Sequence, residues 1–344
     1  MKIKKKIFTQ YAKLKTKEQI MKKNIYPYMA GGLALLGIAA ATPFTPIPQD
    51  NAQPAGSFAT DTGTYYYTHN GTPVEIEKET EEIVIEESVT LLKTIEQKQL
   101  GAKLDSLQNE IEQKIVKMPG TIEVYFEYLP SRQSFSINNK KMYPCSVIKL
   151  FVMAATYDQI FQGTLSEKKC TPYLEDMIII SDNTSYNVLL TMIGKGNGMQ
   201  GIKKVNSCCT SLGLKNTTLH HALLPGNNYF TDGKENVTTP EDVGKLLEKI
   251  QAETLPYSSE MLALLKQCEE DSGLPAGLPE AAVCAHKSGW ADTYYMDAGI
   301  IDNQFILVVF TKDAKKETVS TLCETTYQYL EKEGLLPEKK EEAK

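Results

Sequence analysis

The chain has 344 residues, of which 42% are hydrophobic, so it can bury the core of one large domain and still carry accessory segments. Its formal net charge is −6, but nine lysines and a single glutamate fall within residues 1–25, which leaves the rest of the chain strongly acidic. Such a body excludes general binding of nucleic acid.

The first 45 residues predict export. Residues 1–23 form a basic leader, and residues 24–45 hold a short apolar stretch without charge. Lysines ahead of an apolar run favour a cytoplasmic N-terminus. The small residues at 39–41 fit a signal-peptide cleavage site, whereas the long leader favours a single membrane anchor. On either interpretation the rest of the protein is extracytoplasmic, secreted or anchored to the membrane.

Residues 46–99 are predicted to be a linker followed by an acidic stalk. Prolines, glycines, threonines and serines dominate up to residue 73, and seven glutamates fall between Glu75 and Glu87. The stalk is expected to become helical towards Leu91.

A change of pattern near Leu100 marks the start of the main domain. Apolar residues recur at helical spacing as far as Ile115, and Pro119 and Gly120 end that helix. Residues 122–128 then alternate between apolar and mostly polar side chains, which predicts a half-buried strand, and a return strand begins near Phe135.

The far end of the chain predicts three more strands, at residues 281–290, 298–301 and 305–310, with a turn at Asp302 and Asn303. A last helix carries its apolar residues, Val319 to Leu330, mostly on one face, and residues 146–280 are mainly helical. The expected fold is therefore α+β: a five-stranded antiparallel sheet flanked by the terminal helices, with a mainly helical lobe. The domain should span residues 100–334, followed by a charged tail at 335–344.

Ser146 and Lys149 open an apolar helical run and are three residues apart, so a helix would place both side chains on one face. A lysine in apolar surroundings loses hydration, its pKa falls, and it can then take the proton of a serine. The same spacing also arises by chance, and a lysine near a helix start is usually solvated.

Two further polar motifs follow. Ser181, Asp182 and Asn183 separate two apolar runs, where they could cap a helix or present a hydroxyl and an amide to a cleft. Lys287, Ser288, Gly289 and Trp290 end the first C-terminal strand, where they could bind an anion or form an exposed turn.

Together and in this order, the three motifs resemble those of the class A β-lactamase-like family of penicillin-recognising serine hydrolases, with Ser288 in place of a threonine. The segments around Thr238, Thr239 and Pro240, and around Asp297 to Ile300, resemble the family as well. The resemblance covers roughly residues 100–333.

The resemblance implies that Ser146 attacks a β-lactam or D-alanyl carbonyl, that Lys149 takes its proton, and that Ser181 passes a proton to the leaving nitrogen. Asn183 would hold the substrate amide, and Lys287 and Ser288 its carboxylate. Backbone N–H groups of Ser146 and Trp290 would form the oxyanion hole. Gly289 would let a ligand approach the backbone of the strand. No metal or other cofactor is implied.

The sequence departs from the family at the loop that carries a glutamate for hydrolysis of the acyl-enzyme. No Glu or Asp lies between Leu214 and Thr231, and His220 and His221 are the candidates to replace the glutamate. We therefore expect β-lactamase-type chemistry with weak turnover. The alternatives are a D-alanyl-D-alanine peptidase or transpeptidase acting on peptidoglycan stem peptides, and a non-catalytic β-lactam sensor or cell-wall-binding module.

Overall fold

The computed structural model describes residues 57–60, 63–67, 73–75, 78–227 and 229–337, and the chain divides into two compact units, Met1–Glu87 and Ser88–Lys344. In the first unit, strands β1 (Ser57–Thr60), β2 (Gly63–Tyr67) and β3 (Pro73–Glu75) pair antiparallel within the segment predicted as a linker. The predicted leader and the signal or anchor segment lie outside the described residues. No helix in the described ranges has the length and apolar character needed to cross a bilayer.

The second unit is built on the predicted five-stranded antiparallel sheet, in the order β5-β4-β8-β7-β6. The α+β fold predicted from the sequence is confirmed. The expected turn at Asp302 and Asn303 joins two strands, and both residues have positive φ values, as a tight hairpin requires. Strand β6 begins three residues later than predicted. The strands are β4 (Thr121–Tyr128), β5 (Gln133–Ile137), β6 (Cys284–Ala291), β7 (Tyr294–Ile301) and β8 (Phe305–Lys312).

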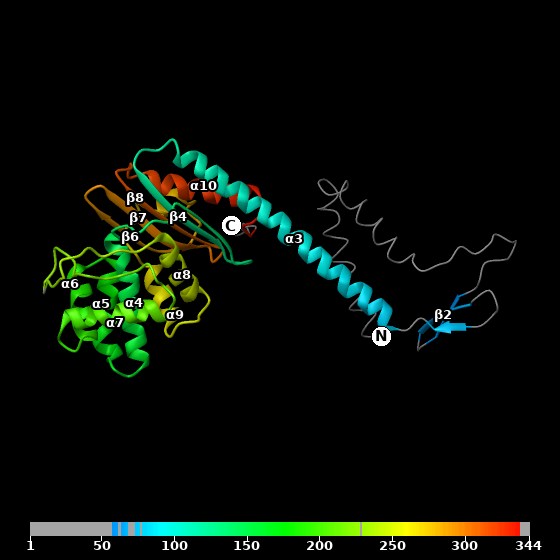
Figure 1. Ribbon diagram of the computed structural model, residues 1–344, viewed down its shortest axis with the longest axis horizontal. Helices are drawn as coiled ribbons and strands as arrows, with labels where there is room; N and C mark the ends of the chain where they lie inside the picture. The colour runs from blue at the N-terminus through cyan, green and yellow to red at the C-terminus, as the bar shows by residue number, and fades with distance from the viewer. Residues whose placement is uncertain (1–56, 61–62, 68–72, 76–77, 228, 338–344) are drawn as a thin grey trace, which may run out of the picture. The chain divides into compact units, whose positions relative to one another are not determined.

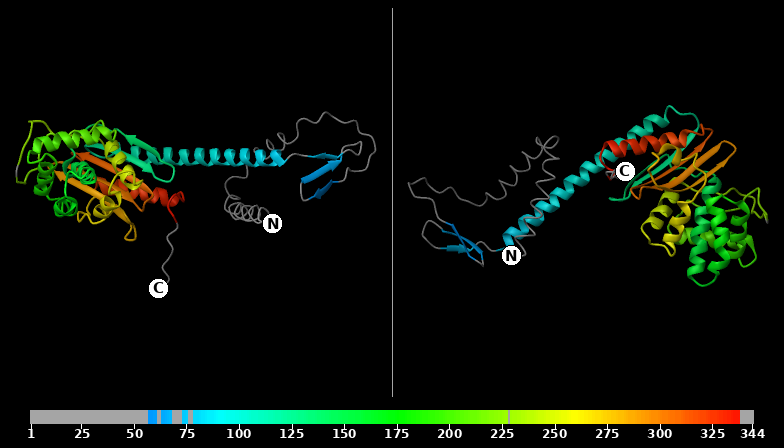
Figure 2. Two further views of the ribbon diagram at one scale, coloured as in Figure 1. Left: turned by 90° about the horizontal axis from the view of Figure 1, so that it is seen from below. Right: turned by 180° about the vertical axis from the view of Figure 1, so that it is seen from behind.

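The two terminal helices cover one face of this sheet, as predicted. Helices α3 (Lys78–Ile115) and α10 (Thr318–Lys332) lie side by side there (Figure 2). Their apolar side chains share one core cluster with inward residues of β4 and β8. The Lys103 ammonium donates a 2.7 Å hydrogen bond to the Glu333 carbonyl. Along α3, the side chains of residues 93–99 are exposed and packing begins at Leu100.

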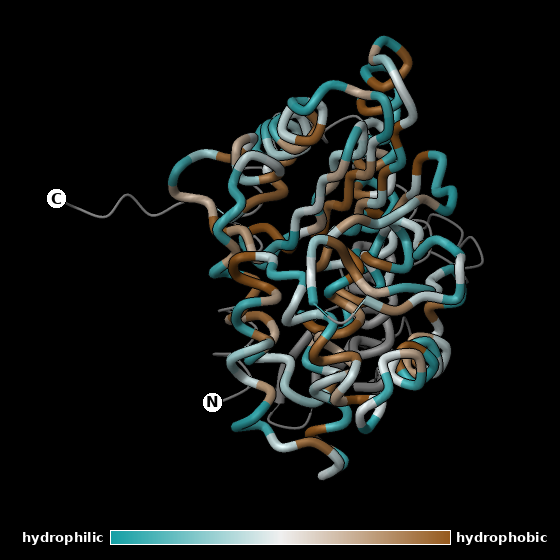
Figure 3. Tube along the Cα trace, turned by 90° about the vertical axis from the view of Figure 1, so that its left-hand side faces the viewer, coloured by the Kyte–Doolittle hydropathy of each residue, from teal (hydrophilic) through white to brown (hydrophobic). Residues whose placement is uncertain are grey.

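A mainly helical lobe occupies the other side of the sheet (Figure 1). Hydrophilic and hydrophobic residues alternate along its outer helices, as expected for amphipathic helices that pack on a core (Figure 3). Its elements are η1 (Cys145–Ile148), α4 (Lys149–Phe161), α5 (Glu167–Ile179), α6 (Asn183–Ile193), α7 (Gly198–Ser211), α8 (Pro240–Gln251), α9 (Ser258–Leu265) and η2 (Pro275–Gly277).

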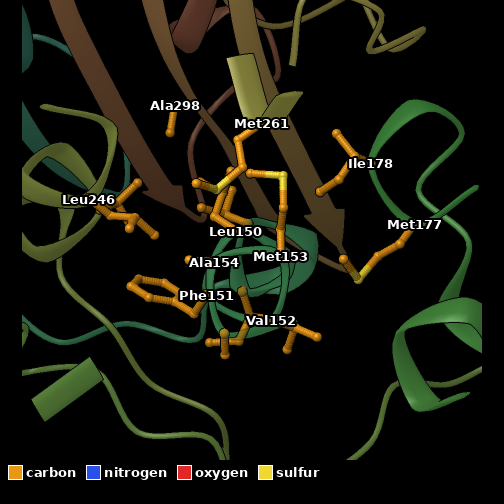
Figure 4. Close-up of a cluster of buried hydrophobic side chains, with 14 of the residues drawn as sticks. Leu150, Phe151, Val152, Met153, Ala154, Met177, Ile178, Leu246, Met261 and Ala298 are labelled. Carbon is orange, nitrogen blue, oxygen red and sulfur yellow. The ribbon is translucent and has the colours of Figure 1, made fainter. Parts of the chain in front are cut away.

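Helix α4 is the centre of the lobe, because every side chain from residue 149 to residue 157 is buried. Leu150, Phe151 and Met153 contact neighbours from α5, α8, α9 and the sheet (Figure 4). A helix that is apolar on all sides is stable only inside a protein. Lys149 is the first residue of this helix, and burial of the residues that follow it keeps the lysine buried as well.

Strand β4 differs from the sequence-based prediction of a half-buried strand, since both of its faces are buried. Its polar side is covered by α8, and the glutamates there are satisfied by hydrogen bonds. The Glu123 carboxylate accepts from the backbone N–H of Lys140 at 2.6 Å, and the Glu127 carboxylate accepts from the Tyr125 hydroxyl at 2.6 Å. Alternation of polarity along β4 therefore does not correspond to alternation of exposure, because carboxylates with hydrogen-bond donors are tolerated in a core.

Gly244 of α8 provides a test of this packing. A glycine in a helix interior normally costs stability relative to alanine. At Gly244, however, a Cβ atom would lie 2.1 Å from a ring carbon of Tyr125 on β4, far closer than van der Waals contact. Gly244→Ala should therefore lower the free energy of unfolding by about 1–3 kcal/mol, measured by urea denaturation.

Gly101 of α3 is the matched control for this substitution. A Cβ atom there would meet only the Gln133 side chain at 3.8 Å, which is ordinary contact. Gly101→Ala should raise the free energy of unfolding by about 0.5–1 kcal/mol. Equal stabilisation by both substitutions would contradict the close approach of α8 to β4.

Candidate active site

The three sequence motifs meet at one cavity of about 620 Å³. Six of the eight residues predicted from the sequence line it, and the other two, Lys149 and Lys287, are fully buried beside it. The lining residues among the predicted set are Ser146, Ser181, Asn183, Ser288, Gly289 and Trp290.

Ser146 is placed by a short turn packed against the edge strand β6. The preceding residue, Cys145, has φ 46°, an unusual conformation for a residue with a side chain, and Ser146 follows in η1. Gly289 of β6 lies so close that a Cβ atom on it would approach the Ser146 backbone nitrogen to 2.7 Å. The glycine of the third motif therefore permits contact between the edge strand and the turn that carries the serine.

The amine of Lys149 lies at the centre of the site. Its Nζ is 2.7 Å from Ser146 Oγ and 3.0 Å from Ser181 Oγ. It is also 2.8 Å from the Ser181 carbonyl oxygen and 2.7 Å from Asn183 Oδ1. Two hydroxyls of separate motifs are thus within proton-transfer distance of a single amine.

The surroundings of Lys149 favour its neutral form. Burial and the nearby charge of Lys287 lower the pKa of Lys149 to about 6, and the opposing carboxylate of Asp182 does not cancel these effects. Burial also lowers the pKa of Lys287. At neutral pH the Lys149 amine therefore has a free electron pair, which is the property a general base needs.

Both interpretations of the second motif hold, each for different residues. Asp182 is the N-cap of α6 and accepts from the Ser185 backbone N–H at 2.6 Å. Ser181, just before the cap, has φ 61°, and with Asn183 it reaches Lys149. The helix start thus fixes the two side chains that flank the amine.

The third motif combines a buried cation with one exposed side chain, that of Trp290. The Lys287 ammonium donates a 3.0 Å hydrogen bond to the Ser288 carbonyl, while Trp290 is 65% exposed on the cavity wall. No arginine joins them, because Arg132, the only one in the chain, pairs with Glu248 beside a different, smaller pocket. Within the described residues, no group of His, Cys, Asp and Glu could hold a metal ion.

The loop before α8 completes one wall of the cavity with Leu224 and Pro225. Leu224 is 62% exposed, and no carboxylate of this loop lines the cavity. His220 and His221 do not line it either. The His220 ring pairs with Asp232 at 2.8 Å, and the His221 ring contacts the Ala222 carbonyl at 2.6 Å.

Asn187 anchors this loop and was missed in the sequence. Its amide group donates to the Leu223 and Asn227 carbonyls and accepts from the Leu223 backbone N–H at 2.9 Å. The signal available was a single asparagine inside the apolar run of α6, where an unsatisfied amide would be costly.

Glu269 and Glu270, which also line the cavity, were missed for another reason. They lie in the loop after α9. The backbone N–H of Glu269 donates a hydrogen bond to the Ile179 carbonyl, which holds this loop against the end of α5. An acidic pair in a loop gives no sequence signal that separates a cleft wall from a solvated surface.

Comparison with known proteins gives a consistent result. The model of the Beta-lactamase enzyme family matches residues 106–173 and 171–330. The structure of PBP-A has a TM-score of 0.57 at 26% identity, covering 66% of this chain and 96% of PBP-A. A point mutant of PBP-A, described as an acyl-enzyme complex with penicillin G, aligns at 26% identity, with a TM-score of 0.57 and coverage of 67% and 97%.

A third similar structure is the extended-spectrum beta-lactamase TLA-1. It aligns with a TM-score of 0.56 at 21% identity, covering 66% of this chain and 98% of TLA-1. At 21% identity this likeness shows the fold alone. In all three comparisons the aligned part of this chain spans nearly the whole length of the other protein.

The pKa of Lys149 can be measured directly. We expect its side-chain NMR signal, in protein with isotopically labelled and otherwise unmodified lysines, to titrate near pH 6, far below the ordinary value of 10.5. Lys149→Gln identifies the signal. Lys287→Gln should move the midpoint to higher pH, because removal of a neighbouring positive charge favours protonation of the amine. A midpoint near the ordinary value in the unsubstituted protein would contradict the burial argument.

Proposed function

This chain belongs to the Beta-lactamase enzyme family, and from that premise we propose that it forms an acyl-enzyme at Ser146 with β-lactams or related amides. The observation that carries the proposal is the pair of contacts from the buried Lys149 amine to the Ser146 and Ser181 hydroxyls, at 2.7 and 3.0 Å. A serine becomes a useful nucleophile when an adjacent base can take its proton.

Counting hydrogen bonds supports Lys149 as this base. A neutral amine has two N–H donors and one electron pair. The Ser181 carbonyl and Asn183 Oδ1 can only accept, so they occupy the two donors. The electron pair is then available to the Ser146 hydroxyl, which donates its proton as Oγ attacks the substrate carbonyl carbon. General base catalysis of this kind typically contributes about 100–10,000-fold in rate.

The remaining steps use the other two motifs. Collapse of the tetrahedral intermediate breaks the carbon–nitrogen bond, and Ser181 passes a proton from Lys149 to the leaving nitrogen. Backbone N–H groups of Ser146 and Trp290 stabilise the oxyanion, each such donor lowering the barrier by about 3–4 kcal/mol. Lys287 and Ser288 attract the substrate carboxylate, and Asn183 binds its amide.

The environment of Leu224 favours slow release of the acyl group. Hydrolysis of the ester needs a base that positions water, and this loop, which carries a glutamate in the family's β-lactamases, presents the aliphatic side chain of Leu224 to the cavity here. The same observation supports the second candidate, a D-alanyl-D-alanine peptidase or transpeptidase. In that case a peptidoglycan amine or water would accept the acyl group. A β-lactam sensor that is acylated without turnover would also hold the adduct, whereas intact Ser146 and Lys149 count against a cell-wall-binding module with a dead site.

We further propose that the folded unit works outside the cytoplasm, where peptidoglycan and β-lactams are found. The basic leader and the apolar residues 24–45 support export through a signal peptide or a membrane anchor. Detection of the mature N-terminus by mass spectrometry would separate cleavage from anchoring.

Labelling with a fluorescent penicillin tests acylation. The unsubstituted chain should acquire one covalent label per molecule, Ser146→Ala should acquire none, and Ser207→Ala should label normally. Ser207 is an exposed serine on α7 whose hydroxyl bonds only to its own helix, so it controls for loss of any serine. A label that survives in Ser146→Ala would sink the assignment of the nucleophile, as would no label on the unsubstituted chain.

Leu224→Glu tests the cause of slow turnover. The new carboxylate would face the cavity and can activate a water beside the acyl ester. We expect hydrolysis of the adduct to accelerate by at least about tenfold, measured as the decay of acyl-enzyme mass with time. Leu224→Gln is the control, because glutamine has the size of glutamate without its charge. Equal acceleration by both substitutions would assign the effect to disturbance of the loop rather than to base catalysis.

A further inference from the structure

A buried ion pair lies beside the third motif and has no part in the acylation steps described above. It consists of His286 on β6 and Asp297 on β7. His286 Nδ1 is 3.0 Å from both carboxylate oxygens of Asp297, and the two residues are 2% and 0% exposed. Burial would lower the pKa of His286, but the charge and the hydrogen bonds of Asp297, with a further contribution from Cys268, raise it to about 10. Imidazolium and carboxylate therefore stabilise each other.

Asp297 connects two segments that form the cavity wall. In the register of β6 and β7 it lies opposite Ser288, which lines the cavity. Its carboxylate also accepts a 2.8 Å hydrogen bond from the backbone N–H of Leu274, in the loop after α9 that supplies two glutamates to the same wall. A Cβ atom on Gly273 would be too close to this carboxylate, so the backbone of the loop packs directly on it. Asp297 therefore holds the loop against the strand that carries the third motif.

Lys287, the cation of the third motif, is fully buried and needs a counter-charge. Among the described residues its ammonium has one hydrogen-bond partner, the Ser288 carbonyl at 3.0 Å, and no carboxylate in ion-pair contact. Burial lowers the pKa of Lys287, and the charges of Cys268, Asp297 and Glu270 oppose this effect. Of the two carboxylates, Asp297 is fully buried and Glu270 is half-buried, so solvent screens the charge of Asp297 less.

The charge on Lys287 matters in two places. It attracts the substrate carboxylate in the reaction proposed above, and it adds to the effect of burial in lowering the pKa of Lys149, the proposed base. Other ionisable side chains act on Lys287, Asp297 or His286 from the surrounding elements: Lys149 on α4, Cys268 and Glu270 in the loop after α9, Cys284 on β6 and Cys323 on α10. Burial raises the pKa of Cys284 and of Cys323 well above the ordinary value, so both are neutral thiols.

We propose that His286 and Asp297 are positioning residues for the part of the cavity that binds the substrate carboxylate. Asp297 balances the buried charge of Lys287 and fixes the adjoining loop, while His286 holds the Asp297 carboxylate ionised and in place. Because the ion pair is neutral as a whole, Lys287 keeps its positive charge for the substrate. Neither residue of the pair lines the cavity, so both act through Lys287. The inference rests on the proposed function, which assigns the substrate carboxylate to Lys287 and Ser288.

The test measures binding, so that it does not depend on whether Ser146 reacts. All variants are made in the full chain carrying Ser146→Ala, and two ligands are compared: penicillin G, and its methyl ester, which lacks the negative charge. Binding is followed by the fluorescence of Trp290, the only tryptophan of the chain, which lies on the cavity wall. We expect a preference for penicillin G that fades with rising pH as Lys287 loses its proton. The midpoint is the pH at which half of this preference is lost.

Asp297→Asn removes the charge and keeps the size of the side chain. The midpoint should fall by about one pH unit or more, because Lys287 gives up its proton more easily without the nearby negative charge. Between the old and new midpoints, penicillin G should bind about tenfold more weakly, whereas the methyl ester should bind as before. Asp302→Asn is the matched control. Asp302 follows β7 and also accepts a backbone N–H, from Val283 at 2.8 Å, and its substitution should leave the midpoint in place.

His286→Gln separates the effect of charge from that of structure. Glutamine can still donate a hydrogen bond to Asp297 but carries no charge, so the full negative charge of Asp297 acts on Lys287. The midpoint should therefore rise, opposite to the change in Asp297→Asn. A merely structural pair would leave the midpoint unchanged or move it in the same direction in both variants. If Asp297→Asn does not fold, His286→Gln alone decides the outcome.

Three results would overturn the proposal: no preference of the parent chain for penicillin G over its ester, an unchanged midpoint in Asp297→Asn, or a midpoint that does not rise in His286→Gln. Penicillin labelling of Ser146 is measured separately on the unsubstituted chain. A chain that is labelled but shows one of these three results retains the proposed function and loses the positioning pair. A chain that is not labelled but shows opposite shifts of the midpoint does the reverse.

Discussion

The site depends on the removal of one ammonium group from water. Lys149 is the first residue of a helix whose next eight residues are all buried, so the amine cannot reach solvent without withdrawing that helix from the core. Desolvation disfavours the charged form, and Lys287 disfavours it further. The free energy that keeps the amine neutral is therefore supplied by the packing of apolar side chains around α4.

The backbone around this amine is arranged by constraints from separate parts of the chain. Two residues with positive φ, Cys145 and Ser181, come just before or at the two serines that flank it. Such conformations persist where surrounding packing fixes them, and here the edge strand β6 and the cap of α6 do so. Asn187 then holds the loop that forms the opposite wall.

Two neighbouring cationic groups respond in opposite ways to the same burial. Burial lowers the pKa of both Lys149 and His286, but only His286 has a fully buried carboxylate in direct contact. Its net pKa therefore rises while that of Lys149 falls. The lysine is left able to accept a proton, whereas the imidazole stays protonated beside its carboxylate. The presence or absence of one buried carboxylate in direct contact thus decides whether the pKa of a buried basic group rises or falls.

Local patterns in the sequence predicted the secondary-structure elements and the residues of the candidate site. Helical spacing, alternation in the strands and the turn at Asp302 and Asn303 predicted the α+β fold, because these patterns depend on neighbours within a few residues. The three motifs predicted the eight site residues. The folded structure was needed to show that strand β4 is buried on both faces, that Glu269 and Glu270 line the cavity, and that His286 contacts Asp297. Burial and electrostatic contact join residues far apart along the chain, so no local pattern encodes them.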